Sequence, residues 1–92
     1  MIKIDGSTLW RGGEKIGWVE NYRVYDKSGY ELGYYENSRV YDRNSRELAW
    51  IEGDYLKMPS GHSIKLEYIY QEVSGGDFSS LARAAVRLLL GD

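Results

Sequence analysis

The stretch RVYDKSGYELGYYENSRVYDRNSREL, residues 23–48, contains Arg-Val-Tyr-Asp twice, and the second copy begins sixteen residues after the first. Aligning the whole chain on this period places similar residues in columns, such as Val24 beside Val40 and Leu56. An aromatic column and the small residues just before it contain Trp18, Tyr34 and Trp50, and Gly17, Gly33 and Ala49. A fixed period of this kind indicates an array of about four copies of one supersecondary element.

Each period holds two short runs rich in Val, Ile, Tyr and Trp, separated by turn residues, which predicts a β-hairpin. The turn within the hairpin begins at Asp26 or Asp42, whose carboxylates we expect to accept backbone N–H groups. Its left-handed position is glycine except in the third copy, where we expect Asn44 rather than Ser45 to adopt that conformation. The turns between hairpins contain Asn21, Asn37 and Gly53.

The repeat therefore predicts a mainly β domain over residues 1–73, built from about four 16-residue hairpins and hence about eight short strands. A radial or barrel-like antiparallel array is favoured, because closure removes exposed sheet edges. An open, flat solenoid is the alternative. The chain of 92 residues forms a single domain with a thin core, which favours self-association.

The alternation in residues 64–68 decides which face points inward. Ile64 and Leu66 are separated by the charged Lys65, so these two side chains are expected to face the core of a strand-like run over residues 64–73. Carried across the repeat, this predicts a core of Leu32 with Tyr34, Leu48 with Trp50, and Ile16 with Trp18. The same assignment places six residues on the outer face: Val19, Tyr35, Ile51, Gly17, Gly33 and Ala49.

The segment after Ser74-Gly75-Gly76 breaks the repeat and predicts the only helix, over residues 77–90, with Asp77 as N-cap and Gly91 as stop signal. Its apolar residues occupy most of the circumference, so it must be buried within the fold or in an oligomer interface. Membrane insertion is disfavoured, because about fourteen residues span only about 21 Å and two arginines would lie mid-segment. The polar stripe consists of Ser79, Ser80, Arg83 and Arg87.

Composition excludes several function classes. A net charge of −2 argues against a dedicated nucleic-acid binder. The absence of cysteine and a single histidine, His62, argue against a structural metal, and we expect no cofactor. The first residues carry no secretory pattern, so a cytoplasmic location is expected.

No nucleophile–base grouping can be read from the chain, so we expect no catalytic residues and no enzyme. The leading interpretation is a non-catalytic domain that forms a homo-oligomer or binds a protein partner. Its candidate interface consists of Phe78, Leu81, Ala85, Leu88 and Leu89 on the helix, and Tyr22, Tyr25, Tyr35 and Tyr41 on the outer face. The alternative is a small-ligand module for carbohydrate or lipid whose stacking platform consists of Trp10, Trp18, Tyr34 and Trp50.

The unit RVYDKSGYELGYYEN, residues 23–37, has a tyrosine-aspartate before a glycine turn and a glycine-aromatic pair after it. It resembles the hairpin repeats of the β-flower families, small bacterial domains whose hairpins are arranged radially. The resemblance covers about residues 1–70 and implies a fold but no defined activity. A looser similarity is to the tubby-like and phospholipid-scramblase fold, in which strands with similar turns close around a central hydrophobic helix. The chain has about half the length that such a barrel needs.

Overall fold

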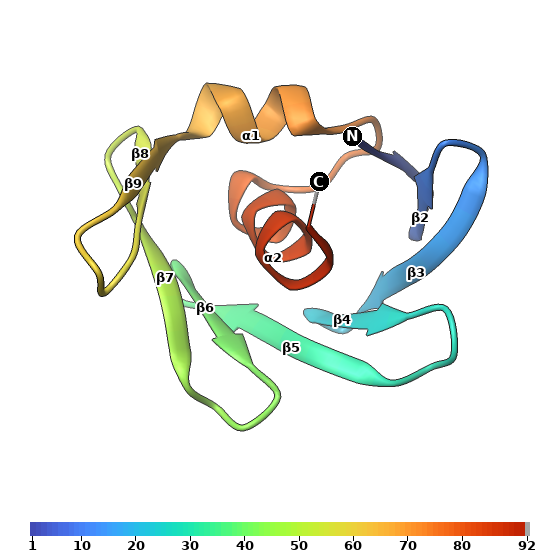
Figure 1. Cartoon of the computed structure of the whole chain (residues 1–92), viewed down its shortest axis with the longest axis horizontal. Helices are drawn as coiled ribbons and strands as arrows, with labels where there is room; N and C mark the ends of the chain where they lie inside the picture. Colours follow the sequence, from blue (N-terminus) through green and yellow to red (C-terminus); the bar gives the residue numbers. More distant parts are fainter. Residues whose placement is uncertain (92) are drawn as a thin grey trace.

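Ten short strands form one sheet that curves around a central helix, with the first nine paired in sequence order and the tenth added beside the first (Figure 1). The computed structural model describes residues 1–91. The strands are β1 (Ile2–Asp5), β2 (Thr8–Arg11), β3 (Glu14–Glu20), β4 (Arg23–Asp26), β5 (Glu31–Glu36), β6 (Arg39–Asp42), β7 (Glu47–Glu52), β8 (Tyr55–Lys57), β9 (Ser63–Lys65) and β10 (Val73–Ser74). The expected hairpin array with a C-terminal helix is confirmed, with two strands more than the repeat predicts.

The sheet is open between its edge strands β9 and β10, and helix α1 (Leu66–Glu72) connects them (Figure 1). β10 returns to pair in parallel with β1, opposite Ile2 and Lys3. The prediction of one strand-like run over residues 64–73 and of a single helix is therefore wrong. Strand alternation ends with β9, and Leu66, Ile69 and Val73 follow at spacings of three and four residues, the spacing of a helix face. Ile69 is completely buried.

The predicted turns form at the predicted positions. Asn21 and Asn37 each open a two-residue turn with positive φ, the conformation that matches the twist of hairpin strands. The Asp26 carboxylate accepts hydrogen bonds from the backbone N–H groups of Ser28 and Tyr30, at 2.9 and 3.1 Å, and Asp42 repeats this pattern. The left-handed residue of the third copy is Ser45, with φ of 66°, and not Asn44. The repeat geometry fixes the left-handed position and overrides the preference of the individual residue.

The face assignment is reversed at the aromatic column. Gly17, Gly33, Ala49, Val19 and Tyr35 are buried inside the ring, whereas Trp18, Tyr34 and Trp50 lie on its outer face, only partly buried. The physical reason is a bulge in each of the first three repeats. Val24 pairs with Gly33 and Tyr25 with Glu31, so Leu32 is an extra residue in β5, and Ile16 and Leu48 are its equivalents. The extra residue resets the alternation, so Leu32 still packs against the core although the residues after it exchange faces.

Helix α2 (Ser80–Leu90) lies in the centre of the ring (Figure 1). Its N-cap is Ser79, whose hydroxyl accepts a hydrogen bond from the Ala82 N–H at 3.1 Å, and not the predicted Asp77, which lies too early in the chain. Gly91 ends the helix with φ of 81°, as predicted. The small residues of the repeat allow the helix to approach, because a Cβ at Gly33 would lie 2.9 Å from Leu89 Cδ1.

The polar stripe of α2 faces α1 and the segment after it. The buried Arg83 guanidinium donates hydrogen bonds to the carbonyl oxygens of Val73, Gly76 and Phe78, at 3.0, 3.2 and 3.2 Å. Arg87 pairs with Glu72 at 2.9 Å. Arg83 thus holds the segment between α1 and α2 against α2 by hydrogen bonds.

Candidate binding surface

The residues expected to form a stacking platform lie on the outer face, but neighbouring side chains already stack on two of them. Trp18 stacks on Tyr25, directly opposite on β4, with ring centroids 5.4 Å apart. Tyr34 stacks in the same way on Tyr41, at 4.9 Å. A cation lies over each stacked pair, since Lys15 is 5.2 Å from the Trp18 ring and Arg23 is 6.0 Å from the Tyr34 ring. These rings stabilise the strand pairs and leave little free face for a sugar ring.

The other two platform residues stand apart from these stacks. Trp50 lies opposite Lys57 on β8, and its indole N–H donates to the Glu52 carboxylate at 3.4 Å. Trp10 borders a separate hollow that also contains Met1 and Lys3. The structure therefore spreads the four predicted platform residues along the outside of the ring and does not gather them into one site.

The predicted interface residues on the helix are directed into the ring. Ala85 is completely buried, and Leu81, Leu88, Leu89 and Phe78 are partly buried against the core. Helix α2 therefore forms the core of the fold, and its apolar face is not an exposed association surface.

The four predicted interface tyrosines have different environments. Tyr22 is the most exposed, at 70 %, and Tyr35, expected on the outside, is only 8 % exposed beneath it. The two rings meet edge to face with centroids 5.7 Å apart. Tyr25 and Tyr41 are partly buried, each against its stacking partner. Burial raises the pKa of the Tyr35 phenol above its ordinary value, and the neighbouring Tyr22 adds to the rise.

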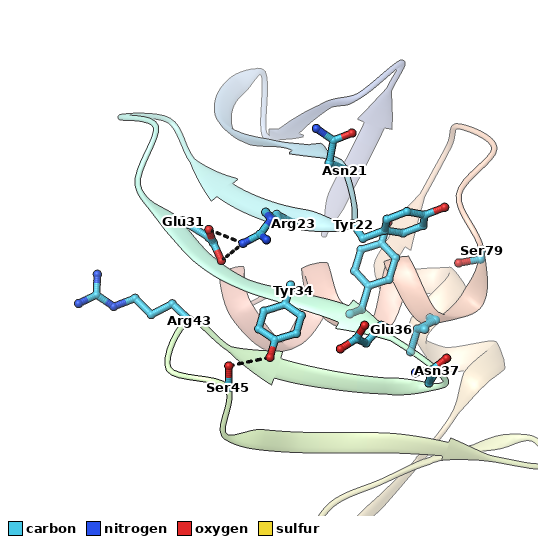
Figure 2. Close-up of a pocket in the computed structure, with 12 residues that line it drawn as sticks. Asn21, Tyr22, Arg23, Glu31, Tyr34, Glu36, Asn37, Arg43, Ser45 and Ser79 are labelled. Carbon is cyan, nitrogen blue, oxygen red and sulfur yellow. Dashed lines mark hydrogen bonds and ion pairs between the residues drawn. The ribbon is translucent and has the colours of Figure 1, made fainter.

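A hollow of about 740 Å³, which we name the Tyr22–Arg43 hollow, is lined by β4, β5, the turns beside them and beyond β6, and the start of α2 (Figure 2). Arg23 and Glu31 form an ion pair in it, with Arg23 Nη1 3.0 and 3.1 Å from the two carboxylate oxygens. The Tyr34 hydroxyl donates to Ser45 Oγ at 2.7 Å. The lining residues are Asn21, Tyr22, Arg23, Glu31, Tyr34, Tyr35, Glu36, Asn37, Arg43, Ser45, Ser79 and Leu81.

Sequence reasoning found Tyr22 but missed Glu31, Arg43 and the adjacent Tyr30. Glu31 and Arg43 follow the repeat, since residues of the same charge, Glu47 and Lys27, lie sixteen residues away. Tyr30 departs from it, because the equivalent residue in the preceding copy is Glu14. Departures from a packing repeat are informative, since packing alone would preserve the repeat.

Replacing Tyr35 by phenylalanine is expected to change how stability depends on pH. The folded state keeps this phenol protonated to higher pH than the unfolded state, so its contribution is complete below about pH 10 and is lost as the pH rises further. Urea unfolding between pH 7 and 11 should therefore show a shallower alkaline loss for Tyr35→Phe than for the original chain. The exposed Tyr68 provides the control variant Tyr68→Phe. Parallel curves for the original chain and Tyr35→Phe would contradict the prediction.

Neither a metal site nor a membrane-spanning helix is found in the part of the chain that the structure describes. Among residues 1–91, no group of three or more His, Asp or Glu side chains is arranged to hold a metal ion. No helix within the same residues has both the length and the apolar character needed to cross a bilayer.

Comparison with known proteins identifies the family. The family model described as 4-fold beta flower protein matches residues 2–76, which includes every strand and helix α1. No curated protein and no solved structure matches the chain. The match covers most of the chain, and the radial hairpins agree with the description (Figure 1). The chain therefore belongs to the 4-fold beta flower protein family.

Proposed function

We propose that this β-flower chain is a non-catalytic domain that binds a protein partner through the outer face of its ring. One observation carries the proposal. The apolar helix α2 is buried inside the curved sheet, and the large aromatic side chains that stay exposed are all tyrosines. They are Tyr22, Tyr30, Tyr55, Tyr68 and Tyr70. Tyrosine combines a large apolar body with a polar end and is enriched at protein interfaces.

The partner is either a different protein or a second copy of the chain. Self-association through α2 loses its basis, because the helix fills its own ring, so a homo-oligomer would use the outer face. The carbohydrate or lipid alternative has less support, because the faces of Trp18 and Tyr34 are stacked on neighbouring side chains. The cytoplasmic location stays a prediction.

The proposal is tested by comparing proteins captured by the full chain with those captured by two surface variants. One variant carries Tyr22→Asn and Tyr30→Ser on the β4–β5 side, and the other carries Tyr55→Ser and Tyr68→Ser on the β8–α1 side. We expect a partner whose capture falls at least about tenfold with one variant and is unchanged with the other.

Light scattering of the full chain reports whether that partner is a second copy. Capture that neither variant changes, together with a monomeric chain, would contradict binding through the outer face. A shift of tryptophan fluorescence by a glycan or lipid vesicle, with no captured partner, would favour the small-ligand alternative.

A further inference from the structure

The second and third repeats differ from the others at one place on the surface. In a repeat protein, residues that serve packing recur, so a position that departs from its column at an exposed site is free to serve another purpose. Two exposed departures, Tyr22 and Tyr30, lie in or beside the Tyr22–Arg43 hollow, and a third, the buried Tyr35, lies beneath Tyr22.

We propose that the Tyr22–Arg43 hollow binds a segment of a partner protein that places a carboxylate side chain on Arg43 and an apolar side chain against Tyr22. The inference rests on the proposed function and names the site and the chemistry of the partner.

The first departure is Tyr30, which replaces a carboxylate that forms an ion pair in the preceding copy. In the preceding copy, Lys27 forms an ion pair with Glu14 at 3.4 Å. Sixteen residues later the same two positions hold Arg43 and Tyr30, and the guanidinium lies 4.5 Å from the Tyr30 ring centroid. Arg43 keeps its charge but makes no ion pair with any carboxylate of residues 1–91. Stacking on an aromatic ring orients a guanidinium and leaves its N–H groups available to a carboxylate.

The second departure places an aromatic ring where the other repeats have small side chains. The equivalents of Tyr22 are Gly6, Ser38 and Asp54. Tyr22 has φ of 65°, a left-handed conformation that costs a bulky residue about 1–2 kcal/mol, yet the residue is 70 % exposed. Beneath it lies Tyr35, where the equivalent residues Val19 and Ile51 are aliphatic. An exposed ring held in a strained backbone conformation is poorly explained by stability and well explained by contact with a partner.

The charges of the hollow decide which ligand it suits. The hollow is lined by two arginines and two glutamates. Arg23 is neutralised by Glu31, and Glu36 lies near Tyr22 and away from Arg43 (Figure 2), so Arg43 is the cation that remains for a ligand at its end of the hollow. A second hollow of about 330 Å³, lined by Arg23, Glu31, Arg43 and Asn44, adjoins the first and shares three of its lining residues. Because Glu31 already occupies Arg23, the two arginines cannot bind one anion together. The site therefore suits a compact anion such as phosphate poorly.

Figure 2 shows Tyr22 and Arg43 at opposite ends of the hollow, with polar side chains between them. A ligand that contacts both must be extended, with an apolar group at one end and an acidic group at the other. A peptide segment with one aromatic or aliphatic and one acidic side chain has this form, and its main chain can use the amide, hydroxyl and carboxylate groups between the ends.

The test is selection of a displayed random peptide library on the folded full chain and on single variants. We expect peptides selected on the original chain to be enriched in Asp or Glu at a fixed distance from an aromatic or aliphatic residue. The variant Arg43→Glu should bind these peptides at least about tenfold more weakly and should itself select Lys or Arg at the acidic position. Arg46, an exposed arginine of the same turn that lines neither hollow, provides the matched control Arg46→Glu, which should change affinity less than about twofold.

Tyr22→Asn separates binding from folding. Asparagine tolerates the left-handed conformation, so relief of strain offsets the lost contact with Tyr35, and the free energy of unfolding should stay within about 1 kcal/mol of the original value. Its peptide affinity should nevertheless fall at least about tenfold.

The site is overturned if the selected peptides are not acidic, if Arg43→Glu binds them as tightly as the original chain, or if no peptide is selected. Peptides whose binding is lost with Tyr55→Ser and Tyr68→Ser, and not with Tyr22→Asn, would also overturn this site. That last result would leave the proposed function standing on another part of the outer face.

Discussion

A chain that ends at Gly76 is expected not to fold, although it retains all ten strands and helix α1. Without α2 the ring has no interior, since Ala82, Ala84, Ala85 and Val86 are buried in its centre and the last three leucines pack beside them. Burial of an apolar side chain contributes about 1.5–3 kcal/mol, and a small domain has a total stability of only about 5–15 kcal/mol. Removing the helix removes this burial and also exposes the inner face of the sheet, so the loss is comparable with the whole margin. Circular dichroism and urea unfolding of the two chain lengths measure the effect.

Two further measurements keep this result interpretable. A peptide of residues 77–92 added to the shortened chain should restore the fold, because the ring can close around a helix that is not covalently attached. The variant Ala85→Lys, which places a charge in the centre of the ring, should destabilise the full-length chain by several kcal/mol. A shortened chain that unfolds cooperatively with the stability of the full chain would show that α2 is an appendage.

The repeat made most of this architecture predictable. The period of sixteen located the hairpins and the turn residues, because both depend on short-range chemistry that recurs along the chain. The radial arrangement was favoured over a flat solenoid by the cost of exposed sheet edges and by the resemblance to the β-flower repeats. The faces of the strands were not predictable by alternation alone, since the bulge at Leu32 and its equivalents shifts the count by one residue. The small residues Gly17, Gly33 and Ala49 were the signal for the inner face, because a helix can approach closely only where side chains are absent or short.

Other features depend on contacts that no local pattern carries. Helix α1 begins at Leu66, a position at which an alternating strand would also have an apolar residue, so only the spacing of Leu66 and Ile69 distinguishes the helix. The helix α2 was predictable as a buried element, but whether it fills its own ring or joins another chain depends on how far the sheet closes. The hollow beside Tyr22 was not predictable as a site, because Arg43 and Tyr30 lie in two separate hairpin turns that only the folded sheet brings together.

Replacing Arg83 by methionine is expected to be among the most destabilising single substitutions in the chain. Arg83 is only 6 % exposed, and its guanidinium is the hydrogen-bond donor for the carbonyl oxygens of Val73, Gly76 and Phe78. It also lies 4.8 Å from the Tyr70 ring centroid. Methionine fills much of the volume but donates nothing, so three carbonyl groups lose a charged donor, and hydrogen bonds to charged groups contribute about 1.5–3 kcal/mol each. Because the three bonds share one guanidinium, we expect a total loss of about 3–5 kcal/mol in the free energy of unfolding, measured by urea titration.

The matched control is Arg87→Met, one turn further along the same helix. Arg87 forms one ion pair with Glu72, and the two side chains are 27 % and 34 % exposed, so solvent screens the interaction and its loss should cost less than about 1 kcal/mol. Equal effects of the two variants would mean that Arg83 contributes as an ordinary surface charge. A large effect of Arg83→Met alone would mean that buried hydrogen bonds, as well as apolar contacts, hold the sheet around helix α2. The β-flower would then depend on one buried arginine to connect α1, β10 and α2, the elements that follow the hairpin repeats.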